Sequence, residues 1–224
     1  IRILQSVSVS PYTLQCSEEI IIFYNFRTFF VHEPLNNKVS YCKSESDECI
    51  DLDLYCRHCL PGISFKAVDI DGNIIGVLIN DVSSVKDVSN TLLIELHNPA
   101  FKKIINMLKI RENGAKLSEK YPNDDNLLEI KLAATDASWR NKGVMNELMQ
   151  ETEKLAKELG MRLIRIDTSS AFSAKSAEKM GFTCVYQRAF SDINIIVPEP
   201  PHIYDRVFIK EIKVEQWGSI SHNI

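Results

Sequence analysis

The order of the central elements follows from Leu127–Phe182, which reads LLEIKLAATDASWRNKGVMNELMQETEKLAKELGMRLIRIDTSSAFSAKSAEKMGF. Apolar and polar residues alternate over residues 128–135, which predicts a strand. Apolar residues then return at helical spacing over 143–159, and a second apolar run at 162–168 predicts another strand. Two strands of one sheet that are joined by a helical crossover run parallel. We therefore expect an α/β sheet with a parallel pair at its centre.

The segment between the first strand and the helix is basic and contains a glycine. Arg140, Asn141 and Lys142 supply positive charge and hydrogen-bond donors, and Gly143 lets the backbone approach a ligand without a side chain in the way. Exposed backbone amides at a helix N-terminus form a site for an anion such as a diphosphate. The alternative is an ordinary strand-turn-helix unit with a solvated basic turn. A nucleotide-bearing cofactor is the first ligand to test.

The rest of the sequence predicts elements on both sides of this unit. We expect helices over 17–31, where Pro34 forbids continuation, within 37–59 and over 101–108. We expect polar connections over 81–91 and 191–202, and over 111–125 a charged connection for which a partly helical structure stays open. We expect strands over 1–8, over 63–70 and 74–80 as a hairpin around Asp71-Gly72-Asn73, and over 182–190 and 203–212.

Composition favours a single soluble domain over residues 1–224, because 45% hydrophobic residues suffice for a sizeable core. The net charge of -4 argues against a nucleic-acid partner, which requires a basic surface. The sequence has no apolar run of the roughly 18 residues that span a membrane, and nothing at its start resembles a signal peptide. We expect a cytoplasmic, monomeric protein.

The cysteines lie at positions 16, 42, 49, 56, 59 and 184. Cys56-Arg57-His58-Cys59 is the one arrangement that suggests a metal site, and Cys42 and Cys49 are its nearest further ligands. A structural zinc site usually brings a second ligand pair at a suitable distance. We favour free thiols and no metal.

The basic segment resembles a known cofactor-binding motif. Arg140-Asn141-Lys142-Gly143-Val144-Met145 is similar to motif A of the GNAT superfamily of acyl-coenzyme A-dependent N-acetyltransferases, Gln/Arg-x-x-Gly-x-Gly/Ala. The first four positions fit the motif. Met145 replaces a small residue, so its side chain could crowd the pyrophosphate or turn inward.

Further segments resemble the insect arylalkylamine N-acetyltransferases within that superfamily. Phe29–Asn36 reads FFVHEPLN and is similar to an Asp-Glu-Pro-Leu-Asn segment, with His32 in place of the acid. Thr168–Ala174 reads TSSAFSA and is similar to a Ser-Ser-x-x-Ser turn of that group. Glu178–Phe182 reads EKMGF and is similar to the Glu-Lys-Leu-Gly-Phe sequence that follows this turn in the group. Pro200-Pro201-His202 is also similar. The likeness extends from about Glu19 to about Lys213.

The resemblance implies a GNAT fold, a mixed central sheet with helices on both faces, and transfer of an acetyl group from acetyl-CoA to an amine. It implies that Glu33 removes the proton from the amine, through water, and that Ser169 and Ser173 complete the proton-handling set. The backbone of Ala133, Ala134 and Thr135 would hold the pantetheine arm and polarise the thioester. The diphosphate would bind at Arg140, Asn141, Lys142, Gly143, Val144 and Met145.

The residues themselves leave alternatives open. Glu33 precedes Pro34 at a helix end, where an acid is poorly placed for the helix dipole, but it could simply be a solvated acid in a turn. His32 could share its role, because histidine is a common general base in proteins. Ser169 and Ser173 could face one cleft or cap a helix. Tyrosine serves in many other GNAT members as the acid that protonates the departing thiolate, so the resemblance makes Tyr186 a reserve candidate for this role.

The resemblance implies an arylalkylamine substrate of the dopamine, serotonin, tryptamine or octopamine type. Tyr24, Phe29 and Phe30 could line its pocket or belong to the core. Three alternatives remain open: a non-aromatic amine such as agmatine or a polyamine, a protein lysine, and a non-catalytic coenzyme A-binding module.

Overall fold

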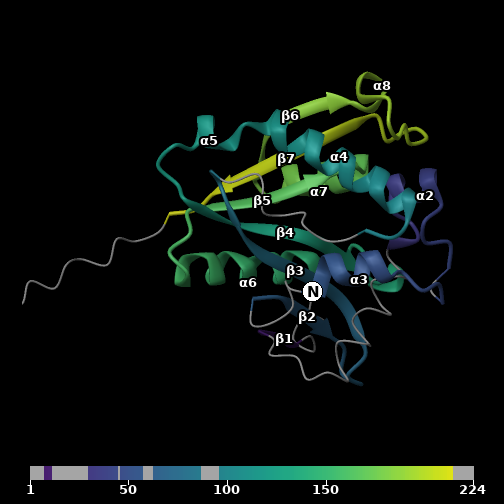
Figure 1. Cartoon of the computed structure of the whole chain (residues 1–224). Helices are drawn as coiled ribbons and strands as arrows, with labels where there is room; N and C mark the ends of the chain where they lie inside the picture. The colour runs from purple at the N-terminus through teal and green to yellow at the C-terminus, as the bar shows by residue number, and fades with distance from the viewer. Residues whose placement is uncertain (1–7, 12–29, 45, 58–62, 87–95, 214–224) are drawn as a thin grey trace, which may run out of the picture.

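The computed structural model describes residues 8–11, 30–44, 46–57, 63–86 and 96–213. Within these residues a seven-stranded sheet has the order β1-β2-β3-β4-β5-β7-β6, from bottom to top in Figure 1. The strands are β1 Ser8–Pro11, β2 Phe65–Val68, β3 Ile74–Ser84, β4 Asn126–Thr135, β5 Leu163–Thr168, β6 Thr183–Ala189 and β7 Tyr204–Glu211. β4 and β5 pair in parallel and the other neighbours are antiparallel. The predicted mixed sheet with a central parallel pair is confirmed.

Helices cover both faces of this sheet, as predicted. On one face lie α2 Pro34–Val39, α3 Ile50–Arg57, α4 Pro99–Ala115, α5 Leu117–Lys120 and α8 Phe190–Ile193, and on the other lie α6 Val144–Glu158 and α7 Ala171–Lys179. In Figure 1, α4 crosses the sheet on the side away from α6 and α7. The one-turn 3₁₀ helix η3, Ala137–Trp139, joins β4 to the loop before α6.

Each face has its own hydrophobic core, because residues along a strand alternate between the two faces. Val144 and Leu148 of α6 pack with Leu128 and Ile130 of β4 on one face. On the other face, Phe101, Ile104 and Ile105 of α4 pack with Val77 and Ile79 of β3. The helical face predicted from the spacing in 143–159 is thus buried against the strand that precedes it.

β4 and β5 separate after three residue pairs. Leu128–Ile130 pair with Ile164–Ile166, after which β4 continues beside β3 and β5 continues beside β7. A β-bulge lies at the point of separation: Ile130 is opposite Asn80 and Leu132 is opposite Ile79, which leaves Lys131 as the extra residue. Because a bulge bends its strand, it helps to open a gap between β4 and β5.

Several predicted boundaries are wrong in ways that the fold explains. β3 extends to Ser84, where a loop was expected over 81–91, because Asp81–Ser84 pair with β4. α4 begins at Pro99, capped by Asn98, and is longer than predicted. The partly helical alternative for 111–125 is confirmed by the end of α4 and by α5, whereas α8 is a short helix in the expected connection over 191–202.

A new helix starts directly at Pro34, since proline is well suited to the first helical position. The predicted helix over 17–31 and the predicted strand over 1–8 lie almost wholly outside the described residues. Within the described ranges, no helix has both the length and the apolar character needed to cross a membrane.

Candidate active site

A cavity of about 590 Å³ lies along the gap between β4 and β5. Its strand residues are Glu129–Ala133 of β4, Arg165 of β5 and the end of β5 with the following turn, Asp167–Ser169. An apolar wall faces them from Phe30 and from α2, α3 and α4, with the side chains of Phe30, Leu35, Leu52, Tyr55, Phe101, Ile104, Ile105 and Leu108. This volume is in the range of small-molecule sites.

Glu33 lies in this cavity and is held by two hydrogen bonds. Its carboxylate accepts from the backbone N–H of Asn36 at 2.6 Å, and the hydroxyl of Ser169 donates to its other oxygen. Burial raises the pKa of Glu33, and the bonds from Ser169 and Asn36 and the charge of Arg111 oppose this effect. The side chain is therefore fixed in position and is a stronger base than an exposed glutamate.

The helix-dipole argument for Glu33 was wrong. Glu33 is the N-cap of α2, so its negative charge lies at the favourable end of a helix that the sequence pattern did not reveal. Its position alone therefore has a structural explanation. The observation that goes beyond capping is the bond from Ser169, which lies 136 residues away in the sequence.

The serines at the end of β5 and the start of α7 differ in what their side chains contact. Ser170 caps α7 by accepting a hydrogen bond from the N–H of Phe172 at 3.2 Å. Ser169 faces Glu33, and Ser173 lines the same cavity from the first turn of α7. The structure thus brings Glu33, Ser169 and Ser173 together at one cavity, and the cap is Ser170 rather than Ser173.

Charged side chains that the sequence interpretation missed form the polar side of the cavity. Arg111 of α4 is buried and bonds to Asp205 of β7 through Nε at 2.9 Å and to Asp167 of β5 at 3.2 Å. Arg165 joins Asp167 at 2.9 Å and Glu112 at 2.5 Å. Although burial disfavours its charge, Arg165 and Arg111 lower the pKa of Asp167. The arginine and carboxylate side chains thus form one buried network of ion pairs.

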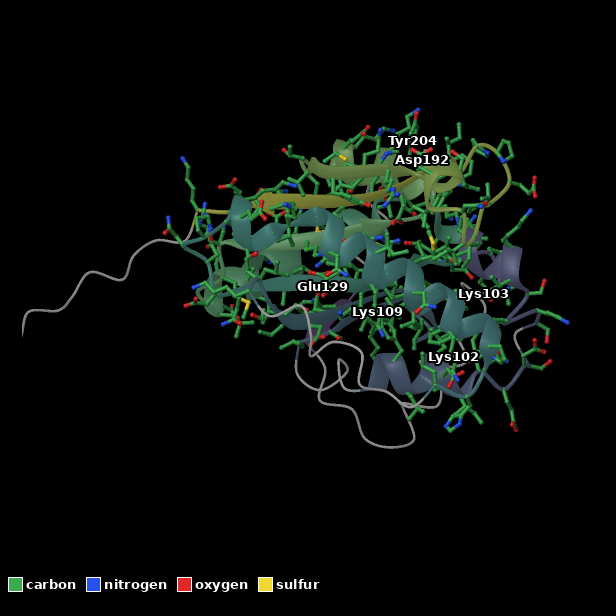
Figure 2. All side chains as sticks on the ribbon, turned by 45° about the horizontal axis from the view of Figure 1, so that its top comes forward. Lys102, Lys103, Lys109, Glu129, Asp192 and Tyr204 are labelled. Atoms are coloured by element: carbon green, nitrogen blue, oxygen red, sulfur yellow. The ribbon has the colours of Figure 1, made fainter. Side chains whose placement is uncertain are left out.

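A second pair lies at the bulge of β4. Lys131 bonds to Glu129 at 2.8 Å, and although burial disfavours its charge, Glu129 raises the pKa of Lys131. In Figure 2, the labelled Lys109 and Glu129 are the cavity-lining residues, whereas Lys102 and Lys103 lie further toward the other end of α4 and are exposed. Charged residues two apart within apolar strands, 129 with 131 and 165 with 167, are the sequence signal for this network.

Glu33 differs from the other acids of the cavity. Glu112, Glu129 and Asp167 each form an ion pair with Lys or Arg. No Lys or Arg among the described residues forms an ion pair with Glu33. The cavity therefore presents a carboxylate that is available to a cationic ligand.

The predicted anion loop leads into α6 on the other face of the sheet. Asn141 and Gly143 have φ of 61° and 89°, and α6 starts at Val144 without a side-chain cap, so its first amides are available to an anion. Lys142 lies 4.8 Å from the ring centroid of Trp139. Met145 packs inward against the core. The Met145 alternative is thereby decided in favour of the inward side chain.

A sequence profile described as the acetyltransferase (GNAT) family matches residues 34–182, which is more than half of the chain. The chain belongs to this family.

Solved structures of similar fold agree with this assignment. Arylalkylamine N-acetyltransferase 2 from Aedes aegypti is 25% identical, with a TM-score of 0.80 over 92% of this chain and 99% of that one. A putative arylalkylamine N-acetyltransferase 7 from the same mosquito is 18% identical, with a TM-score of 0.80 over 92% and 88%. A Drosophila melanogaster polyamine N-acetyltransferase that forms N-acetylagmatine is 16% identical, with a TM-score of 0.74 over 92% and 100%.

GNAT enzymes use acetyl-CoA, and the described residues fit that molecule at two places. The uncapped start of α6, next to Arg140 and Lys142, suits a diphosphate. The gap between β4 and β5 leaves an edge of β4 without a strand partner beyond Ile130. Of the predicted pantetheine contacts, Ala133 lines the cavity, Thr135 ends β4, and Ala134 packs in the core near α4.

Of the remaining candidate residues of this GNAT domain, Tyr186 and His32 lie outside the cavity wall. Tyr186 of β6 does not line the cavity, and its ring lies against Gly114 of α4. His32 is exposed and is also absent from the cavity wall. Phe30 lines the cavity, whereas Tyr24 and Phe29 fall outside the described residues.

The described residues also hold no cluster of His, Cys, Asp and Glu suited to a metal. Cys42 and Cys49 are buried in the core beside α2 and α3. Positions 58 and 59 of the Cys56–Cys59 segment fall outside the described residues.

Proposed function

We propose that this GNAT domain transfers the acetyl group of acetyl-CoA to the primary amine of an arylalkylamine, with Glu33 as the general base. The observation that carries the proposal is the state of Glu33. Its carboxylate is fixed by Ser169, forms no ion pair with a Lys or Arg among the described residues, and lies in a cavity with an aromatic and aliphatic wall. An arylalkylammonium ion offers this site one positive charge and one apolar ring.

The chemistry requires proton removal before bond formation. An alkylammonium group with a pKa near 10 must lose a proton before its nitrogen can attack a thioester. A base is most effective when its pKa approaches the working pH, so the burial that raises the pKa of Glu33 improves it as a base. We assign the proton transfer to Glu33 through water.

Ser169 and Ser173 complete the proton-handling set. Ser169 orients the carboxylate of Glu33, and Ser173 places a second hydroxyl on the same cavity. The diphosphate of acetyl-CoA would bind at Arg140–Met145, and the backbone of Ala133–Thr135 would hold the pantetheine arm and polarise the thioester carbonyl. Acetyl-CoA supplies the activated acyl group: the C–N bond forms as the thioester C–S bond breaks, and the departing thiolate takes up a proton and leaves as the free thiol of coenzyme A.

The ion pairs of the cavity argue against a polyamine as the substrate. A second ammonium group would need a second available carboxylate, and Glu112, Glu129 and Asp167 are already neutralised by buried cations. The ring of Phe101 lies 4.8 Å from that of Tyr41 and 6.4 Å from that of Tyr55, measured between centroids. Such a cluster of aromatic side chains at the cavity favours a substrate with an aromatic ring.

The test is a panel of amines with acetyl-CoA, in which released thiol is measured. Dopamine, serotonin, tryptamine and octopamine should be acetylated faster than agmatine and spermidine. Glu33→Gln should lose this activity, and Glu112→Gln, which changes a paired acid of the same cavity, should retain most of it. Turnover of agmatine or spermidine alone would replace the substrate assignment. Acetyl-CoA binding, seen as a raised melting temperature, without turnover of any amine would indicate a non-catalytic module.

A further inference from the structure

One buried polar group at the cavity lacks a hydrogen-bond partner. The side chain of Thr168 is the last of β5, is 2% exposed and lines the cavity. Among the cavity-lining residues, all of which the structure describes, Thr168 is the one whose buried side-chain oxygen has no partner. A buried hydroxyl without a partner costs free energy, and native proteins seldom retain one without a reason.

The direction of the strand places this hydroxyl on the side of the predicted cofactor loop. β5 pairs regularly with β7 from Leu163 to Thr168, so its side chains alternate without interruption. Arg165 and Asp167 face α4, and Ile164 and Ile166 belong to the core under α6 and α7. Thr168 therefore lies on the face of α6, whereas Glu33 contacts the cavity from the face of α4.

The neighbouring strand supplies no side-chain partner. If the pairing of Ile130 with Ile166 continued, Leu132 would stand opposite Thr168, but β4 has already separated from β5 at this point. Leu132 and Ala133 line the cavity there and carry no polar side-chain group. The gap between β4 and β5 therefore offers room for a partner of this hydroxyl that neither Leu132 nor Ala133 supplies.

We propose that the Thr168 hydroxyl binds the pantetheine arm of acetyl-CoA as the arm passes between β4 and β5. A hydroxyl can donate to a carbonyl oxygen and accept from an N–H, and the arm carries both groups. Thr168 is then a donor-binding residue and has no part in amine recognition. The inference rests on the proposed function in that acetyl-CoA is the acyl donor.

The test compares Thr168→Val, which keeps the shape and removes the hydroxyl, with Thr168→Ser, which keeps the hydroxyl. Titration calorimetry with acetyl-CoA should show about threefold to tenfold weaker binding for T168V, the value of one hydrogen bond, and binding within twofold of wild type for T168S. The KM for the amine should stay unchanged. The ligand-free T168V protein should melt at the same temperature as wild type or higher, because an unsatisfied polar group has been removed.

The outcomes separate this inference from the proposed function. Equal affinity of wild type and T168V for acetyl-CoA would overturn the role of Thr168 and leave Glu33 untouched. A lower melting temperature of ligand-free T168V would show that the hydroxyl already has a structural partner, and would overturn it as well. Failure of wild type to bind acetyl-CoA would overturn both. Failure to acetylate arylalkylamines would leave the inference standing if T168V binds acetyl-CoA more weakly than wild type.

Discussion

The two sides of the gap between β4 and β5 are built in different ways. The proposed cofactor side consists mainly of residues 133–145, one continuous segment from the end of β4 to the start of α6, to which our inference adds Thr168. The groups proposed to bind the cofactor there are mostly backbone amides. The amine side combines Glu33, α4 and the turn after β5, which lie far apart in the sequence and depend on side chains. The first is set by local geometry, whereas the second depends on the whole fold. Substitutions should therefore affect the two sides separately.

We expect the largest difference between the effects on amine turnover and on acetyl-CoA binding for Glu33→Gln. Loss of a positioned general base should lower kcat/KM for the amine by about 10²- to 10⁴-fold. The affinity for acetyl-CoA should stay unchanged, because Glu33 and residues 140–145 lie at different places in the fold. Steady-state kinetics and calorimetry on the same preparation measure the two effects. Activity within a few-fold of wild type would remove Glu33 from the mechanism.

Arg111→Met tests how far the amine side depends on its buried ion pairs. The substitution leaves Asp205 and Asp167 without their shared cation, so the free energy of unfolding should fall by about 3–5 kcal/mol. Urea denaturation measures this loss.

The matched control for this prediction is Arg162→Met. Arg162, whose side chain is 44% exposed, bonds to the less exposed Asp124 and to the exposed Glu211, both at 2.6 Å, and a solvent-screened pair contributes at most about 1 kcal/mol. Equal losses for the two variants would mean that the buried network contributes no more than a surface pair.

The contrast between the two sides also explains what could be predicted from the sequence. β4, α6 and β5 were predicted to within two residues, because strand alternation, helical spacing and Gly160 are local signals. The loop at Arg140–Gly143 was recognisable for the same reason.

The amine side could be predicted only in part. The resemblance pointed to Glu33, Ser169 and Ser173, but no local signal showed that Glu33 caps α2 or that Arg111 reaches Asp205 across 94 residues. The bulge at Lys131 was equally hidden, because it follows from the register of β4 against β3. Such contacts are properties of the assembled sheet.

Gly76→Ala tests the packing that supports the cofactor side. A methyl group on Gly76 would lie 2.7 Å from Val144 Cγ1 and 3.2 Å from Leu148 Cδ1, so it would push on the first turn of α6. Overpacking of this kind should cost about 1–3 kcal/mol of unfolding free energy and should weaken acetyl-CoA binding. The double variant Gly76→Ala with Val144→Ala should recover part of both losses. Unchanged binding in the single variant would show that α6 can shift without consequence for the donor.

The smallest effect expected is the pH dependence of stability due to Glu33. Burial raises the pKa of Glu33 above its ordinary value of 4.5, so the folded protein holds this proton more tightly than the unfolded chain does. The stability gained in this way is complete below the unfolded pKa and is lost as the pH rises through the folded pKa. Relative to Glu33→Gln, which cannot titrate, wild type should therefore become less stable as the pH rises above the ordinary value of 4.5, as urea denaturation at several pH values would show. A stability of wild type that rises with pH relative to Glu33→Gln would mean that the bonds from Asn36 and Ser169 lower the pKa of Glu33 more than burial raises it. The carboxylate of Glu33 would then be better suited to binding a cation than to accepting a proton.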